Sequence, residues 1–205
     1  LDSILAQDNE SHVACESLAT KGLVVISGEV RTNANIDTEQ VVKDTIKEIG
    51  YNKSNSGVDP SDIEVLSKLH SQSPEIAQGV DSEDLASQGA GDQGLMFGYA
   101  CKETPELMPL PIQISHRLTE KLTDLRKSGE LQWLRPDGKS QVSVAYENGS
   151  PISIEKTVIA TQHNDMIKEY GSEESELKFV EQEVINHVIK PVLDSYGYPY
   201  SENFI

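Results

Sequence analysis

The order of apolar and polar residues predicts two folded parts separated by a polar segment. In the first part, alternating or continuous apolar residues predict strands over residues 12–16, 23–31 and 62–69. A helix should lie between the second and third strands, because Asp37 is a good amino-terminal cap and Gly50 a good stop. Its expected buried stripe consists of four residues at helical spacing, Val42, Thr45, Ile46 and Ile49.

The second part should begin with a strand over residues 93–102 and continue with a helix over residues 112–127, which Gly129 ends. Asn148-Gly149 stands between two alternating apolar runs and therefore predicts a β-hairpin. A last helix is expected over residues 175–194, with Pro191 as a kink or an end. Its buried stripe should consist of Leu177, Val180, Val184 and Val188.

The segment from residue 70 to residue 91 is rich in Ser, Gln, Gly, Asp and Pro and has hardly any apolar periodicity. Loops of this length usually carry function or lack fixed structure. The pattern therefore predicts a first domain over residues 1–70, an active-site loop and linker over 71–91, and a second domain over 92–205. Strands and helices follow one another in both parts, which predicts an α+β fold with repeated βαβ-type units.

Charge narrows the possible partners. The chain has 34 acidic against 17 basic side chains, a net charge of -17, which argues against binding to nucleic acid or to an anionic membrane surface. An anionic ligand would need local lysines or bound cations, so metal ions are expected. No apolar run could span a bilayer, and Cys15 and Cys101 have no metal or redox spacing. We read both as small buried thiols of a cytoplasmic protein.

The most informative string is Gly89-Ala90-Gly91-Asp92-Gln93-Gly94-Leu95-Met96-Phe97-Gly98-Tyr99. Its four glycines surround one carboxylate, and glycine allows the backbone to approach a ligand closely. The string resembles the signature of S-adenosylmethionine synthetases. Further blocks resemble that family in the same order: Ala14-Cys15-Glu16, Gly28-Glu29-Val30, Gln72-Ser73-Pro74, residues 78–81 and residues 133–142.

The resemblance implies three similar α+β domains around a pseudo-threefold axis, of which this chain would hold most of the first and all of the second. It also implies an enzyme that joins L-methionine to ATP, with release of phosphate and diphosphate. Two Mg²⁺ ions and K⁺ would be its cofactors, and a homodimer or homotetramer would place the active site between subunits. The family's amino-terminal motif and the signatures of its carboxyl-terminal half have no match, so the chain is expected to be inactive alone.

Three residues are expected to contact methionine. Asp92, among glycines, can reach an α-ammonium group, although it could instead cap the entrance of a strand. Glu29 interrupts an apolar strand, where alternation alone would let it face solvent, but the resemblance implies that it contacts methionine. Gln72 opens the polar segment, and the matching glutamine of the family touches methionine.

Four further residues are assigned to ions and nucleotide. Glu16 ends a short apolar run, and the resemblance makes it a K⁺ ligand rather than only a solvated strand end. Asp137-Gly138-Lys139 matches the family's ATP-binding segment, where Asp137 would position the nucleotide and Lys139 would stabilise the leaving triphosphate. Pro136-Asp137-Gly138 is equally good chemistry for a turn, and both interpretations can hold.

The histidines show no pairing at metal-ligand spacing and are interpreted as structural: His12, His70, His116, His163 and His187. Most Mg²⁺ ligands would then lie outside this chain. A noncatalytic short paralogue that regulates a complete synthetase is the alternative function, and an unrelated acidic interaction module is the third. Asp92, Lys139, Glu29 and Gln72 together argue against the regulator, which has no need of all four.

We predict that residues 72–82 form a lid that closes over methionine and ATP, since their Ser, Gly and Ala content suits a mobile loop. Protease should cut this segment readily in the protein without ligands, and slowly with methionine and an ATP analogue bound. Equal cutting rates in the two states would argue against a gating role.

Overall fold

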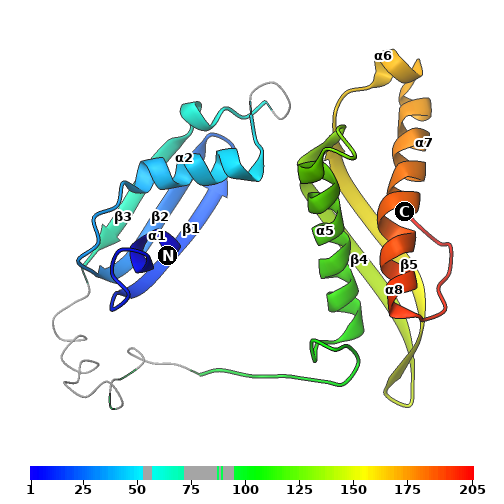
Figure 1. Cartoon of the computed structure of the whole chain (residues 1–205), viewed down its shortest axis with the longest axis horizontal. Coiled ribbons are helices and arrows are strands. Elements are labelled where there is room, and N and C mark those ends of the chain that lie inside the picture. The colour runs from blue at the N-terminus through cyan, green and yellow to red at the C-terminus, as the bar shows by residue number, and fades with distance from the viewer. Residues whose placement is uncertain (53–56, 72–86, 88, 90–94) are drawn as a thin grey trace. The chain divides into compact units, whose positions relative to one another are not determined.

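The computed structural model describes residues 1–52, 57–71, 87, 89 and 95–205. Contacts within the chain define two compact units, Leu1–Phe97 and Gly98–Ile205 (Figure 1). Each unit contains one small sheet with helices packed on it, so the predicted α+β class is confirmed. No helix among the described residues is both long and apolar enough to cross a membrane.

The first unit is built on a three-stranded sheet of β1 (His12–Thr20), β2 (Leu23–Arg31) and β3 (Glu64–His70), in that order. β1 and β2 are antiparallel, whereas β2 and β3 are parallel. A parallel pair needs a crossover connection, and α2 (Thr38–Ile49) supplies it. The short helix α1 (Asp2–Leu5) precedes the sheet, and a 3₁₀ turn, Pro60–Asp62, leads into β3.

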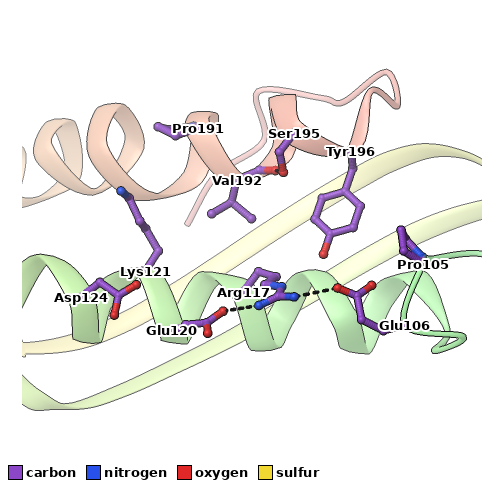
Figure 2. A pocket seen from close by; sticks show the side chains of 10 residues that line it. All are labelled: Pro105, Glu106, Arg117, Glu120, Lys121, Asp124, Pro191, Val192, Ser195 and Tyr196. Atoms are coloured by element: carbon purple, nitrogen blue, oxygen red, sulfur yellow. Dashed lines mark hydrogen bonds and ion pairs between the residues drawn. The ribbon is translucent and has the colours of Figure 1, made fainter.

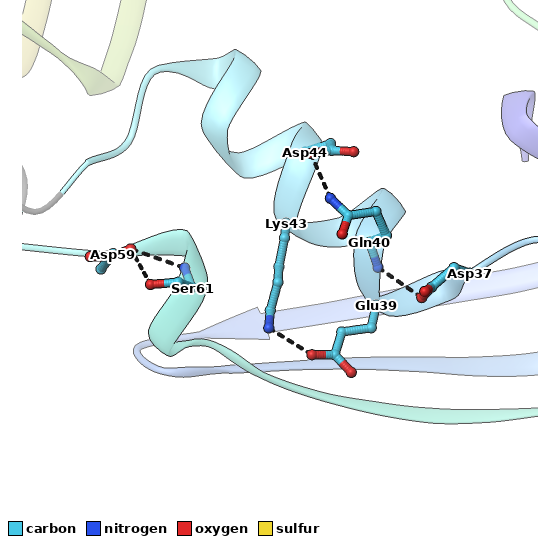
Figure 3. A network of polar contacts seen from close by, with 7 residues as sticks. All are labelled: Asp37, Glu39, Gln40, Lys43, Asp44, Asp59 and Ser61. Atoms are coloured by element: carbon cyan, nitrogen blue, oxygen red, sulfur yellow. Dashed lines mark hydrogen bonds and ion pairs between the residues drawn. The ribbon is translucent and has the colours of Figure 1, made fainter.

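The ends of α2 follow the sequence signals (Figure 3). The carboxylate of Asp37 accepts a hydrogen bond from the backbone N–H of Gln40 at 3.0 Å, and Gly50 ends the helix at φ 109°. The predicted stripe was only half right, because Val42 and Ile46 pack on the sheet whereas Thr45 is exposed and Ile49 is 41% exposed. The helix therefore contacts the sheet along a narrow line.

The second unit contains α5 (Leu110–Ser128) and an antiparallel hairpin of β4 (Leu134–Glu147) and β5 (Ser150–His163). Asn148 and Gly149 have φ values of 50° and 78°, the positive angles that a two-residue hairpin turn requires, so the predicted hairpin is confirmed. The remaining helices are α6 (Ile167–Tyr170), α7 (Glu173–Val184) and α8 (Lys190–Tyr196). The last residues run parallel to β5 through Tyr200 and Phe204.

The core of the second unit lies between its helices and one face of the hairpin. Leu110, Ile114 and Leu118 of α5 are fully buried there. The last predicted helix is interrupted by a π-helical turn, Ile185–Ile189, immediately before Pro191. Proline has no N–H to donate and crowds the preceding turn of a helix. Pro191 is therefore a local cause for the irregular turn that precedes it.

Two expectations, one about a strand over residues 93–102 and one about the burial of both cysteines, were wrong. The predicted strand over residues 93–102 pairs with no other strand in its described part, and Leu95, Met96 and Phe97 are 82%, 89% and 92% exposed. Alternation favours an extended backbone, but a strand also needs a partner, and the described residues offer none here. Cys15 and Cys101 are half-buried rather than buried.

Gly28 is the glycine that β1 and β2 most need. Its φ is 143°, and a Cβ atom there would overlap the carbonyl oxygen of Ala14 on the neighbouring strand. Gly22 also has positive φ, at 78°, but a Cβ there would meet nothing. A side chain at Gly22 would therefore cause backbone strain alone, whereas a side chain at Gly28 would also crowd the neighbouring strand.

We predict that Gly28→Ala destabilises the first unit by roughly 2–4 kcal/mol, because strain and overlap add. Gly22→Ala, the matched control, should cost only about 1 kcal/mol, the ordinary penalty of a left-handed non-glycine residue. Urea unfolding of both variants measures the difference. Equal losses would show that strand crowding at Gly28 contributes nothing.

Candidate functional site

The first group of candidate residues lies on one face of the first sheet. Side chains alternate along β2, so Val24 and Ile26 are buried beneath α2 whereas Glu29 points to the opposite face. Glu16 on β1 lies opposite Ser27, and Ala14 lies opposite Glu29. Glu16 and Glu29 are therefore diagonal neighbours on the uncovered face.

Glu29 has a histidine beside it. In the parallel pairing of β2 with β3, Glu29 lies opposite His70, and the distance from the Glu29 Oε1 to the His70 Nδ1 is 4.0 Å. The Glu29 side chain is 40% exposed and the His70 side chain 64% exposed. Both groups can thus be reached by a ligand on this face. The sequence alone predicted a structural role for His70, and the register of β3 places it next to Glu29.

Asp137, Gly138 and Lys139 lie inside β4, not in a turn before a strand. The ladder pairs Leu134 with His163 and then Gly138 with Thr161, so the intervening residues of β4 form a bulge. Asp137 and Lys139 are exposed, and bulges often re-aim side chains in this way. The turn interpretation of Pro136-Asp137-Gly138 was wrong because α5 holds the segment in the sheet.

The contact between β4 and α5 is close at this bulge. A Cβ atom on Gly138 would lie 3.3 Å from the Cδ1 of Leu122, and the Ser140 hydroxyl donates to the Ser115 carbonyl oxygen at 2.8 Å. Residues on the other face of β4, including Lys139 and Gln141, are exposed. Strand alternation after the bulge thus presents Lys139 on the exposed face of β4.

Glu103 follows the glycine-rich string and was not singled out from the sequence. Its Oε2 accepts hydrogen bonds from the backbone N–H of Leu110 at 2.8 Å and from the Tyr146 hydroxyl at 2.6 Å. The first bond caps α5, whose preceding residue Pro109 has no capping side chain, and the second ties the segment to β4. These bonds, with the Leu110 N–H first, lower the pKa of Glu103, and local desolvation raises the pKa of Tyr146.

A polar cleft of about 560 Å³ lies between α5 and α8 (Figure 2). Arg117 crosses its floor and donates to Glu106 and to Glu120, each at 2.6 Å. Hydrogen bonds to these two carboxylates raise the pKa of Arg117 above its usual range. Arg117 is thus already paired twice, and three carboxylates line the cleft with it, Glu106, Glu120 and Asp124.

In the described part of the chain, no group of three His, Cys, Asp or Glu side chains has the geometry to hold a metal ion. Two histidines lie beside carboxylates: His163 lies 3.7 Å from Glu176, and His187 lies 3.7 Å from Glu130 and from Glu183. Glu176 is buried and also accepts from the Met166 N–H at 2.6 Å.

The structure thus brings Glu16 and Glu29 onto one sheet face and places Asp137, Gly138 and Lys139 together on β4, at and just after its bulge. Asp92 and Gln72 lie outside the described residues, as does the predicted lid.

Two small sheets, each with helices on one face, define an α+β protein of two similar-sized domains. Comparison with protein families finds the S-adenosylmethionine synthetase N-terminal domain over residues 1–74 and the central domain of the same family over residues 87–203. The S-adenosylmethionine synthase of Oleidesulfovibrio alaskensis is 50% identical over 198 residues, which are 97% of this chain and 49% of that protein.

The chain belongs to the S-adenosylmethionine synthetase family, and the resemblance inferred from its motifs is confirmed. It spans about half the length of the curated relative that it matches.

We predict that Glu103→Gln weakens the second unit at neutral pH by roughly 1 kcal/mol, because the charged acceptor of two hydrogen bonds is lost. The folded pKa of Glu103 lies below its ordinary value of 4.5, so its contribution is present above that value and fades as the pH falls through the folded pKa. The melting temperatures of wild type and variant should therefore converge in acid.

The control is Glu147→Gln, which removes the same charge from an exposed position at the end of β4. A constant difference between Glu103→Gln and wild type from pH 7 to pH 3 would contradict the role of the Glu103 charge.

Proposed function

We propose that this chain carries the methionine-facing and part of the nucleotide-facing residues of a methionine adenosyltransferase. Such an enzyme forms S-adenosylmethionine from L-methionine and ATP and releases phosphate and diphosphate. The strongest support is that the chain matches the N-terminal and central domains of the family in that order. It also has Glu29, Asp92 and Lys139 at the expected motif positions. The noncatalytic paralogue is the second candidate, and the retained residues speak against it.

The chemistry requires two reactants in line. The methionine sulfur attacks the ribose 5′ carbon while triphosphate leaves, so the site must orient both substrates and stabilise the departing anion. In our proposal, the Asp92 and Glu29 carboxylates hold the methionine ammonium group and Gln72 contacts the same substrate. The exposure of Glu29 on an uncovered sheet face supports this role.

The bulge of β4 supplies the nucleotide side of the site in this proposal. Lys139 is exposed and makes no ion pair or hydrogen bond with its side chain among the described residues, so its charge is available to a phosphate. Asp137 would position the nucleotide, and Gly138 would leave room for it. A cation held beside the leaving triphosphate contributes most when negative charge has developed there.

A K⁺ site at Glu16 is proposed because its side chain offers the oxygen ligands that hard cations prefer. Glu16 is an exposed carboxylate opposite the Ser27 hydroxyl, and such oxygen ligands fit K⁺, which would add positive charge near the substrates when bound. The described residues do not gather the carboxylates that Mg²⁺ would need, so no residue here is assigned to Mg²⁺.

A homodimer or homotetramer is proposed for the assembly. The uncovered face of the first sheet carries two apolar side chains, Leu18 and Leu66, which are 61% and 40% exposed. Packing of such a face against a second subunit would bury them and place Glu16 and Glu29 at the interface.

The test is to replace the matching 198 residues of the Oleidesulfovibrio alaskensis synthase by this chain and to assay S-adenosylmethionine formation from methionine, ATP, Mg²⁺ and K⁺. Turnover by the chimera supports the proposal. A chimera that folds and assembles like the relative but forms no product would favour the noncatalytic paralogue.

In an active chimera, we predict that Lys139→Met lowers kcat by at least about tenfold, or roughly 1.4 kcal/mol of transition-state stabilisation. Lys156→Met is the matched control, because Lys156 lies opposite Ser143 on the same hairpin. An unchanged kcat for Lys139→Met, with a lowered melting temperature, would restrict Lys139 to a structural role.

A further inference from the structure

A small cavity lies between α5 and the bulge of β4, entirely within the second unit. It measures about 50 Å³, and Arg126 and Thr123 of α5, Arg135 and Gly138 of β4, and Thr161 of β5 are among its lining residues. A buried water needs roughly 10–15 Å³ of such space, so the cavity can hold a few waters or one small ion.

Arg135 lines this cavity and carries one buried donor without a partner. Its Nη1 donates to the carbonyl oxygens of Leu134 at 3.0 Å and Gln132 at 3.3 Å, but its Nε is buried without any hydrogen-bond partner. A buried donor of a charged group is rarely left unpaired, because it has lost its water and gained nothing. An acceptor is therefore expected next to Arg135.

A second guanidinium lies at the same cavity. Arg126 is in the last turn of α5, where the helix dipole favours a cation, and it makes no side-chain hydrogen bond or ion pair in the part of the chain that the structure describes. Burial, followed by the positive charge of Arg126, lowers the pKa of Arg135. In contrast, Arg117 in the same unit bonds to two carboxylates.

The remaining polar groups of the cavity do not compete as donors. The Thr123 hydroxyl donates to the Thr119 carbonyl oxygen at 3.1 Å, and the Thr119 hydroxyl donates to the His116 carbonyl oxygen at 3.0 Å. The free donors and the net charge of the cavity both come from arginine. An acceptor that is also negatively charged satisfies both, whereas water satisfies only the first.

We propose that this cavity binds a small inorganic anion between the guanidinium groups of Arg126 and Arg135. The anion offsets the repulsion of two like charges and accepts hydrogen bonds from the guanidinium N–H groups that line the cavity. It also fastens the end of α5 to the stretch of β4 that carries Asp137 and Lys139. The size of the cavity favours a halide, and a compact oxyanion such as phosphate shares the same chemistry.

The direct test is to soak crystals of the protein in sodium bromide and, separately, in sodium phosphate. We expect an anomalous bromide peak, or phosphate density, within hydrogen-bond distance of the Arg126 and Arg135 guanidinium groups. Bromide alone identifies a halide site, and phosphate alone identifies an oxyanion site. Water at this position in both soaks would overturn the proposal.

A solution test uses melting temperatures in sodium chloride, bromide and phosphate against sodium gluconate at equal ionic strength, since gluconate is too large to enter. The fitting anion should raise the melting temperature by roughly 2–4 °C. Arg126→Gln should lose this rise. Lys127→Gln should keep it, because Lys127 is an exposed cation on the next position of α5. An equal rise in wild type and Arg126→Gln would contradict the site.

Discussion

Strand side chains alternate between two faces, and in each unit the helices cover only one of them. One face of each sheet therefore forms the core, and the other face is free to carry candidate site residues. In the first sheet, Val24 and Ile26 hold α2 while the opposite face keeps Glu29 within reach of solvent. In the second, Val142 contributes to the core and Lys139 stays exposed. A substitution on one face can therefore change a proposed ligand contact without removing a core residue.

The features that the sequence predicted correctly are those decided by neighbouring residues. Asp37, Gly50 and Asn148-Gly149 act within one turn of backbone, so cap, stop and hairpin were found where expected. Pro136-Asp137-Gly138 was misjudged because its local preference for a turn is overridden by α5, which lies far away in sequence. The strand predicted over residues 93–102 was wrong for a related reason. A strand must pair with another strand, and the pattern of one segment does not show whether such a partner is present.

The same distinction applies to the candidate site. Strand alternation and hairpin pairing are enough to place Glu16 and Glu29 on one face, and the motif resemblance supplied the residues themselves. Glu103 and Arg135 could not be found in this way, because each acquires its role from partners on other elements. Glu103 serves Leu110 and Tyr146, and Arg135 shares a cavity with Arg126. A single sequence does not show which distant residues a charged side chain will contact, so roles of this kind could not be predicted.

The π-helical turn before Pro191 has a consequence for the phase of the long helical segment. Buried residues recur every four positions, at Glu176, Val180, Val184, Val188 and Val192. An α-helix repeats every 3.6 residues, so a strict four-residue spacing would rotate this stripe by about 40° at each step and carry it away from the hairpin. A wider turn absorbs part of that rotation. The turn at Ile185–Ile189 thus reduces this rotation, which helps to keep both ends of the buried four-residue repeat on the same core.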